Sequence, residues 1–209
     1  FHTLTSRGVI AHFDSSSYER HIWFARIGDG SLGGKARGLA FLNNLVYKHR
    51  LSEQYPNIKV SIPRTVVIAT DYFDQFILEN DLQYVIDSEI SDDEVLSEFV
   101  SSRLPEDLVD QLRVFIETAR SPLAVRSSSK LEDSSYQPFA GVYSTYMIPL
   151  VENKDQMLRM LGKAIKSVYA SVFYGSSRTY IHTTANLLSE EKMAVVVQSI
   201  CGSEHNGFY

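Results

Sequence analysis

Two separated groups of residues in this sequence have the types and spacing that phosphate binding needs. In the first group, Gly33 and Gly34 precede Lys35, and a pattern typical of a helix follows. Glycines let a backbone approach a ligand closely, the N–H groups at a helix N-terminus suit an anion, and lysine adds a mobile positive charge. The group therefore predicts a phosphate site at a helix start, with a flexible turn that caps a helix as the structural alternative.

The second group begins at Arg126, which ends a short apolar run and is followed by three serines. The guanidinium fork matches a pair of phosphate oxygens, and hydroxyl groups can add hydrogen bonds. Taken alone, Arg126 is equally well explained by an ion pair with Glu132 or Asp133. The polar stretch over residues 127–138 is predicted to be a loop, and a solvated turn explains its serines without any ligand.

A third pattern offers a different nucleotide. Gly28, Gly30 and Gly33 have the G-x-G-x-x-G spacing of dinucleotide-binding turns, so an NAD-binding oxidoreductase domain is an alternative. That fold needs an acidic residue at the end of the next strand, where it binds the ribose hydroxyls. The sequence predicts that this strand ends at residues 62–64, Ile-Pro-Arg, where no acid occurs. The dinucleotide interpretation is therefore weak.

The elements that must position these groups are both helices and strands. Periodicity and capping signals predict helices and strands in no simple repeat, so the fold class is α/β in the mixed α+β sense. Five helices are predicted: one from residue 35, one over 71–79, one after the Ser91–Glu94 capping box, one after Pro105 and one over 153–173. Strands are predicted over 21–27, 58–69, 122–125, 141–150 and 193–197.

Two of the predicted helices carry a definite apolar face. In the helix after Pro105, the apolar residues recur at helical spacing and are predicted to be buried: Leu108, Leu112, Phe115 and Ile116. In the helix from residue 35, the face is predicted to contain Leu39, Leu42, Leu45, Val46 and His49.

Composition limits the function classes. The 209 residues are 44% hydrophobic and 22% charged, and the net charge is −5, which argues against a nucleic-acid or anionic membrane partner. No apolar run reaches the roughly 20 residues of a membrane span, and the single cysteine, Cys201, favours a cytoplasmic location. None of the six histidines has metal-ligand spacing, so no metal site is predicted in this chain.

Taken together, the motifs resemble the N-terminal ATP-binding region of the phosphoenolpyruvate synthase and pyruvate phosphate dikinase family, which also includes glucan, water dikinases and rifampicin phosphotransferases. Four segments carry the resemblance, in the family's order: Gly33-Gly34-Lys35, Val125-Arg126-Ser127-Ser128, Phe139-Ala140-Gly141 and Met193–Gln198. The resemblance implies an ATP-grasp-like N-terminal nucleotide-binding module that is incomplete. Ser129, Ser134 and Ser135 depart from the small apolar and Leu-Pro residues common in the family loop.

The resemblance also implies roles for single residues. Lys35 and Arg126 would contact the ATP phosphates and form the catalytic pair. The other implied residues would line the nucleotide pocket, with the last beside the adenine: Gly33, Gly34, Gly141, Thr145 and Gln198. The magnesium ligands are expected outside this chain.

For the whole protein, the resemblance implies a relay in which ATP phosphorylates a histidine on a swivelling domain, which then passes the phosphoryl group to pyruvate or a related acceptor. The expected partners are ATP and the phosphohistidine and pyruvate-binding domains of the same polypeptide. Residues 1–27 are predicted to be an N-terminal extension, 28–200 the first part of the ATP-grasp domain, and 201–209 the start of a linker. The chain alone is expected to bind ATP weakly without turnover, and a non-catalytic sensor module remains an alternative.

Overall fold

The fold is built on one six-stranded sheet, seen in a computed structural model that describes residues 10–13, 23–55, 57–58, 60–129, 143–183, 192–202 and 205. The strand order is β1-β2-β3-β6-β4-β5. The strands are β1 Ala11–His12, β2 Phe24–Ile27, β3 Thr65–Ile68, β4 Leu123–Ser129, β5 Thr145–Ile148 and β6 Met193–Ser199. The predicted mixed α and β class is confirmed.

Strand β6 lies at the centre of the sheet although it comes last in the chain. It is antiparallel to both β3 and β4, whereas β1, β2 and β3 run parallel to one another. Residues 193–198 are all buried. The continuous apolar run in this segment predicted such a strand, covered on both faces. The sheet also includes β1 and β2, which lie within the predicted extension of residues 1–27.

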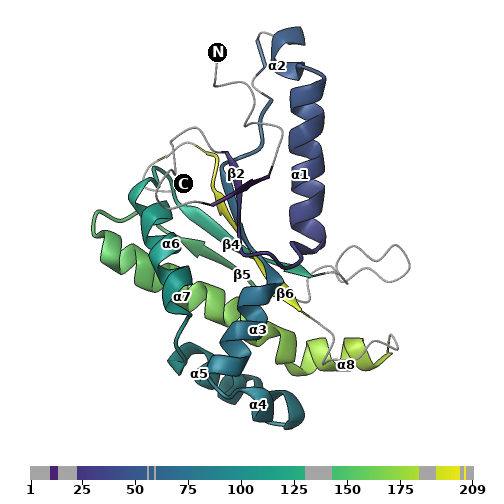
Figure 1. Ribbon diagram of the computed structural model, residues 1–209, viewed down its shortest axis with the longest axis vertical. Coiled ribbons are helices and arrows are strands. Elements are labelled where there is room, and N and C mark those ends of the chain that lie inside the picture. The colour runs from purple at the N-terminus through teal and green to yellow at the C-terminus, as the bar shows by residue number, and fades with distance from the viewer. Residues whose placement is uncertain are drawn as a thin grey trace.

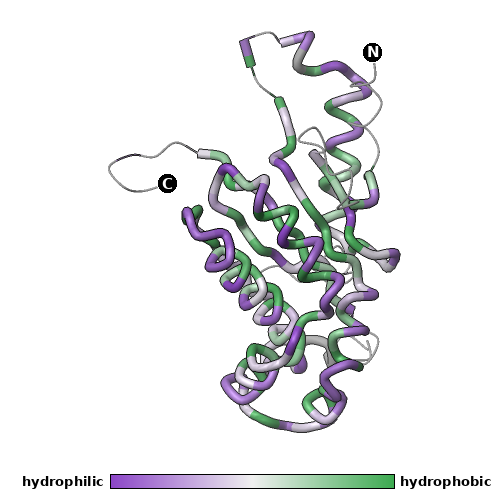
Figure 2. Tube along the Cα trace, turned by 60° about the vertical axis from the view of Figure 1, so that its left-hand side comes forward, coloured by the Kyte–Doolittle hydropathy of each residue, from purple (hydrophilic) through white to green (hydrophobic). Residues whose placement is uncertain are grey.

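Helices cover both faces of the sheet. Helix α1 lies on one side, and α6 and α7 lie on the other (Figure 1). The helices are α1 Gly33–Lys48, α2 Leu51–Gln54, α3 Thr70–Glu79, α4 Gln83–Asp87, α5 Asp92–Ser101, α6 Glu106–Glu117, α7 Lys154–Ala170 and α8 Gly175–Thr183, with a short 3-10 helix at Ser171–Phe173. Along them, hydrophilic and hydrophobic residues alternate, as expected for helices with one buried face (Figure 2).

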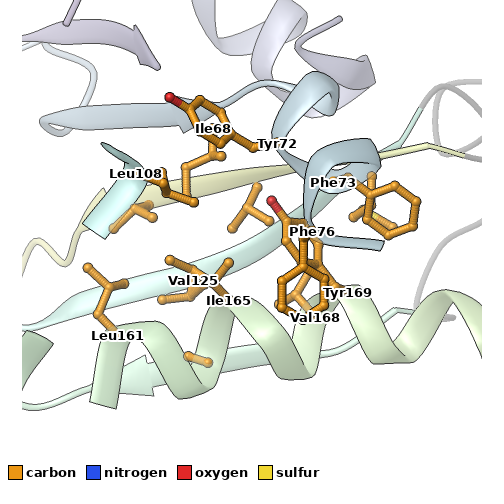
Figure 3. Close-up of a cluster of buried hydrophobic side chains, with 14 of the residues drawn as sticks. Ile68, Tyr72, Phe73, Phe76, Leu108, Val125, Leu161, Ile165, Val168 and Tyr169 are labelled. Atoms are coloured by element: carbon orange, nitrogen blue, oxygen red, sulfur yellow. The ribbon is translucent and has the colours of Figure 1, made fainter. Parts of the chain in front are cut away.

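The main core lies between the sheet and the helices α3, α5, α6 and α7. Side chains from α3, among them Phe73 and Phe76, point toward Tyr169 of α7 (Figure 3). Phe76 is fully buried, with its ring centroid 5.7 Å from that of Phe99 and 5.5 Å from that of Tyr169. Aromatic pairs at such distances add to the stabilisation that comes from buried area, so this cluster stabilises the packing of α3, α5 and α7.

Several sequence predictions are confirmed by these elements. Ser91 and Glu94 form the predicted capping box at the start of α5. The four apolar residues predicted to be buried on α6 are buried: Leu108, Leu112, Phe115 and Ile116. Helices α4 and α8 were not predicted, and the segment over residues 60–64 is not a strand. The reason is Pro63, which has no N–H to donate to a sheet.

The apolar face predicted for α1 is not the face that the helix buries most deeply. The residues that α1 buries are small: Gly33, Gly34, Ala36 and Ala40. Leu42, by contrast, is 49% exposed. A helix that lies close to strand backbones buries small side chains there, and periodicity of large apolar residues cannot reveal that choice.

Candidate functional site

The N-terminus of α1 is fastened to the C-terminal half of β4. The Ser128 hydroxyl donates a hydrogen bond to the Leu32 carbonyl, at 2.8 Å, and accepts one from the Ala36 N–H, at 3.1 Å. Gly33 adopts φ of +70°, and a Cβ atom there would lie 1.8 Å from the Ser128 carbonyl oxygen. Only glycine fits this position, because both the conformation and the close backbone approach exclude a side chain.

This contact brings together the two predicted phosphate-binding groups, which are about ninety residues apart in sequence. The half-buried Lys35 donates a hydrogen bond from Nζ to the Ser127 hydroxyl, at 3.0 Å. Arg126 is the preceding residue of β4 and is also half-buried. The Lys35 ammonium is therefore held one residue away from the guanidinium-bearing position.

The predicted loop over residues 127–138 is wrong for its first three residues. Ser127, Ser128 and Ser129 continue β4 and pair with Val195, Ala194 and Met193 of β6. All three serines are fully buried. Buried hydroxyls need hydrogen-bond partners, and the start of α1 supplies them to Ser127 and Ser128. The turn propensity of serine could not predict these partners, because they come from a distant part of the chain. Residues 130–142 lie outside the described residues.

Strand register places Arg126 on the α1 side of the sheet. Arg126 pairs with Val196 of β6, and Val196 packs with Leu32 and Ala36 in the small core under α1. Directly cross-strand residues share a face. Thr145 pairs with Arg126 from the other side and is exposed, so these two predicted site residues are immediate neighbours.

Gln198 lies further along the same face. It pairs with Ala124, two residues before Arg126 on β4, so its side chain is on the side of α1 as well. Gln198 is buried, and its amide Nε2 donates a hydrogen bond to the Thr65 hydroxyl, at 3.0 Å. Of the remaining predicted residues, Gly34 is buried in the first turn of α1, and Gly141 lies outside the described residues.

The glycine loop before α1 closes on the protein itself. Arg26 donates hydrogen bonds from its guanidinium to the carbonyls of Gly28, at 2.8 Å, and Gly30, at 2.9 Å. The Asp71 carboxylate accepts the N–H of Asp29, at 2.8 Å, and its Oδ1 would lie 2.5 Å from a Cβ atom at Gly28. These contacts shape the loop and were not predicted, because they join residues from three separate elements.

The position of Asp71 corrects the sequence argument on dinucleotide binding. The strand parallel to β2 is Thr65–Ile68, so the predicted strand end at residues 62–64 was wrong, and Asp71 comes shortly after the observed strand. This carboxylate, however, already accepts the loop's own N–H group. Glycine at position 28 is therefore explained by its positive φ and by its close packing against Asp71, without any cofactor.

Two further properties of the described residues bear on function. No group of three or more His, Cys, Asp or Glu among them could hold a metal ion. None of the helices in the described part of the chain has the length and apolar character that crossing a membrane requires.

Most of the chain is similar to known proteins. Residues 29–208 match the family model described as pyruvate phosphate dikinase, AMP/ATP-binding domain. The sequence is also similar to the uncharacterized phosphotransferase YvkC of Bacillus subtilis (strain 168), with 32% identity over 146 residues. That alignment covers 70% of this chain but only 16% of the relative.

Proposed function

Because the chain belongs to the family of pyruvate phosphate dikinase AMP/ATP-binding domains, we propose that Lys35 and Arg126 hold the phosphates of ATP in a phosphotransferase. The resemblance predicted from the motifs is confirmed at the level of the family, and an ATP-binding module of a phosphotransferase is the function that follows. The roles of individual residues are our proposal.

One observation carries the proposal: the hydrogen bond from Lys35 Nζ to Ser127 Oγ, next to Arg126. It fixes the Lys35 ammonium against β4, at the residue that follows Arg126 in the chain. Two cationic side chains contributed by this one segment of the fold favour a multiply charged anion. A triphosphate supplies such an anion, and the N-terminus of α1 adds the positive end of the helix dipole.

The two cations suit different parts of phosphoryl transfer. That reaction depends mainly on positioning the phosphates and on neutralising the charge that develops on them. Arginine can fix two oxygens at once, whereas lysine is a compact point charge on a mobile stem. We therefore assign orientation of the phosphates to Arg126 and charge neutralisation to Lys35.

The other site residues have supporting roles in the proposal. Gly33 permits the approach of α1 to β4, so it acts through the position of Lys35. Gly34, Thr145 and Gly141 line the pocket, and Gln198 lies beside the adenine. The shared sheet face of Arg126, Thr145 and Gln198 supports this order along the nucleotide.

The activity of the whole protein is a further proposal, because the aligned region is 16% of the phosphotransferase relative. We propose that ATP phosphorylates a histidine on a swivelling domain, and that the phosphoryl group passes to pyruvate or a related acceptor to form phosphoenolpyruvate or its counterpart. Magnesium ligands and both partner domains lie outside this chain in that scheme. The chain alone then binds ATP weakly and does not turn it over.

The test is a titration of the isotope-labelled chain with magnesium-ATP, followed by NMR of the backbone amides. We expect shifts around residues 33–35, 126–128, 145 and 198, and their loss in Lys35→Ala. The matched control is Lys48→Ala, which removes an exposed cation from the last turn of the same helix and leaves the shifts unchanged.

A parallel titration with NAD separates the rival function. Shifts with NAD centred on residues 28–33, without shifts for ATP, would overturn the proposal in favour of a dinucleotide site. ATP shifts that persist in Lys35→Ala would show that the phosphates bind elsewhere on the chain.

A further inference from the structure

A groove lies on the opposite side of the sheet from α1, between α6, α7 and the segment that joins α5 to α6. Its volume is about 580 Å³, within the range of roughly 300–1,000 Å³ that small-molecule sites occupy. The groove is remote from the proposed phosphate site, because α7 and the sheet lie between them. Nothing in the proposed function uses it.

The charges around the groove are strongly one-sided. Five cationic residues line it, against a single carboxylate: Arg103, Arg113, Arg159, Lys163 and Lys166, with Asp155. In a chain with a net charge of −5, such a concentration of cations marks a local positive potential that favours an anion.

Some of these cations already have partners. Arg113 forms an ion pair with Asp155, at 2.8 Å, and the Lys166 ammonium donates to the carbonyls of Val100 and Ser102 at the end of α5. Burial lowers the pKa of Lys166, and the charge of Lys163 lowers it further. The cost of placing Lys163 beside Lys166 would be offset by an anion bound between them.

Three cations remain available to a ligand. Within the part of the chain that the structure describes, the side chains of Arg103, Arg159 and Lys163 form no ion pair and no hydrogen bond. Arg159 and Lys163 are four residues apart on α7, so they lie on the same face of that helix. Together they can bind one phosphate or carboxylate group.

The floor of the groove is apolar. Leu104, Leu112 and Leu158 line it, and Leu112 is fully buried. Gly162, in the middle of α7, also lines the groove, and a Cβ atom there would lie 3.5 Å from Leu104. Glycine weakens a helix interior by roughly 0.5–1 kcal/mol relative to alanine, and at this position its missing side chain widens the groove.

We propose that this groove binds a small organic anion, in which a phosphate or carboxylate contacts Arg159 and Lys163 and an apolar group lies on Leu104 and Leu158. The combination of an apolar floor with a few charged groups at one side is the common pattern of small-ligand sites. The site is distinct from the ATP site, so its ligand is a second molecule that binds on the far face of the sheet.

The test uses phenyl phosphate as the probe and the amide NMR spectrum of the isotope-labelled chain as the readout. We expect saturable shifts at residues 100–113 and 155–166. In Arg159→Gln and in Lys163→Gln we expect the dissociation constant to rise by about three- to tenfold, as for the loss of one partly exposed charge contact. Lys48→Gln, an exposed cation on α1, is the matched control and leaves binding unchanged.

Two comparisons complete the test. Benzyl alcohol has the ring without the charge, so we expect it to bind much more weakly than phenyl phosphate. Lys35→Ala is expected to keep the phenyl phosphate shifts in the groove, which separates this site from the proposed ATP site.

Three results would overturn the proposal. One is equal binding in the Gln variants and the parent chain; another is equal binding of benzyl alcohol. The third is the absence of phenyl phosphate shifts in the groove.

Discussion

The two faces of the central sheet are packed in different ways. Under α1, the contacts are made by small residues, Gly33, Ala36 and Ala40, together with the hydroxyl of Ser128. Under α3 and α7, they are made by large aromatic side chains such as Phe76 and Tyr169 (Figure 3). The first face brings backbones close together, whereas the second removes a large apolar area from water.

We infer from this difference that the α1 face serves the proposed nucleotide site, whereas the aromatic face contributes most of the stability. Close approach under α1 places Lys35 within hydrogen-bonding distance of Ser127, beside Arg126. The buried area of the aromatic face stabilises the fold in proportion to the apolar surface removed from water. Substitutions on the two faces should therefore separate stability from nucleotide binding.

The largest expected effect is on the aromatic face. Phe76→Ala removes a fully buried ring that contacts Phe99 and Tyr169, so we expect a loss of about 3–5 kcal/mol in the free energy of unfolding. Urea denaturation measures it. Phe76→Leu keeps most of the volume and should lose much less. ATP-induced shifts at Lys35 should persist in Phe76→Leu, and their disappearance would break the separation of the two faces.

The next effect is on the α1 face. Gly33→Ala adds a Cβ atom where the Ser128 carbonyl already lies and where φ is +70°, so we expect a loss of about 2–4 kcal/mol. ATP binding should also fall, because α1 must move away from β4.

The control for this change is on the same helix. A Cβ atom at Gly38 would meet no atom within 4 Å, so Gly38→Ala should stabilise the chain by about 0.5–1 kcal/mol and leave ATP binding unchanged. Equal effects of the two substitutions would contradict a special role for the contact between Gly33 and Ser128.

The smallest effect concerns the hydroxyl of Tyr169, which is buried and has no hydrogen-bond partner among the described residues. Burial raises the pKa of Tyr169, and the charge of Asp71 raises it further. Tyr169→Phe removes this unsatisfied group, so at pH about 7 we expect equal stability or a gain of up to about 1 kcal/mol.

The pH dependence sharpens that prediction. A folded-state pKa raised above the unfolded value of about 10 means that the unfolded chain loses its proton first, so stability is full below pH about 10 and falls as pH rises further. Denaturation curves at pH about 8 and about 10.5 should show a smaller alkaline loss in Tyr169→Phe. Tyr72, whose pKa burial and Asp107 also raise, accounts for part of the remaining loss. An identical alkaline loss in the variant would contradict the assignment to Tyr169.

The helices with strong local signals could be predicted from the sequence. The capping box at Ser91 and the apolar spacing on α6 specify their elements within a few residues, because the interactions are local. The length of β4 could not be predicted. Ser127 and Ser128 favour turns locally, and only hydrogen bonds to Lys35 and to the start of α1 make their burial possible.

For the site, the sequence by itself determined the residue types: two phosphate-binding groups and their order along the chain, which sufficed to identify the family. It did not determine which glycines pack closely against other residues, or that Asp71 accepts a hydrogen bond from the glycine loop. Nor did it determine that Arg126, Thr145 and Gln198 share one face of the sheet. Those properties were decided by tertiary structure, because each depends on strand register or on a contact between residues far apart in sequence, and no local preference encodes either.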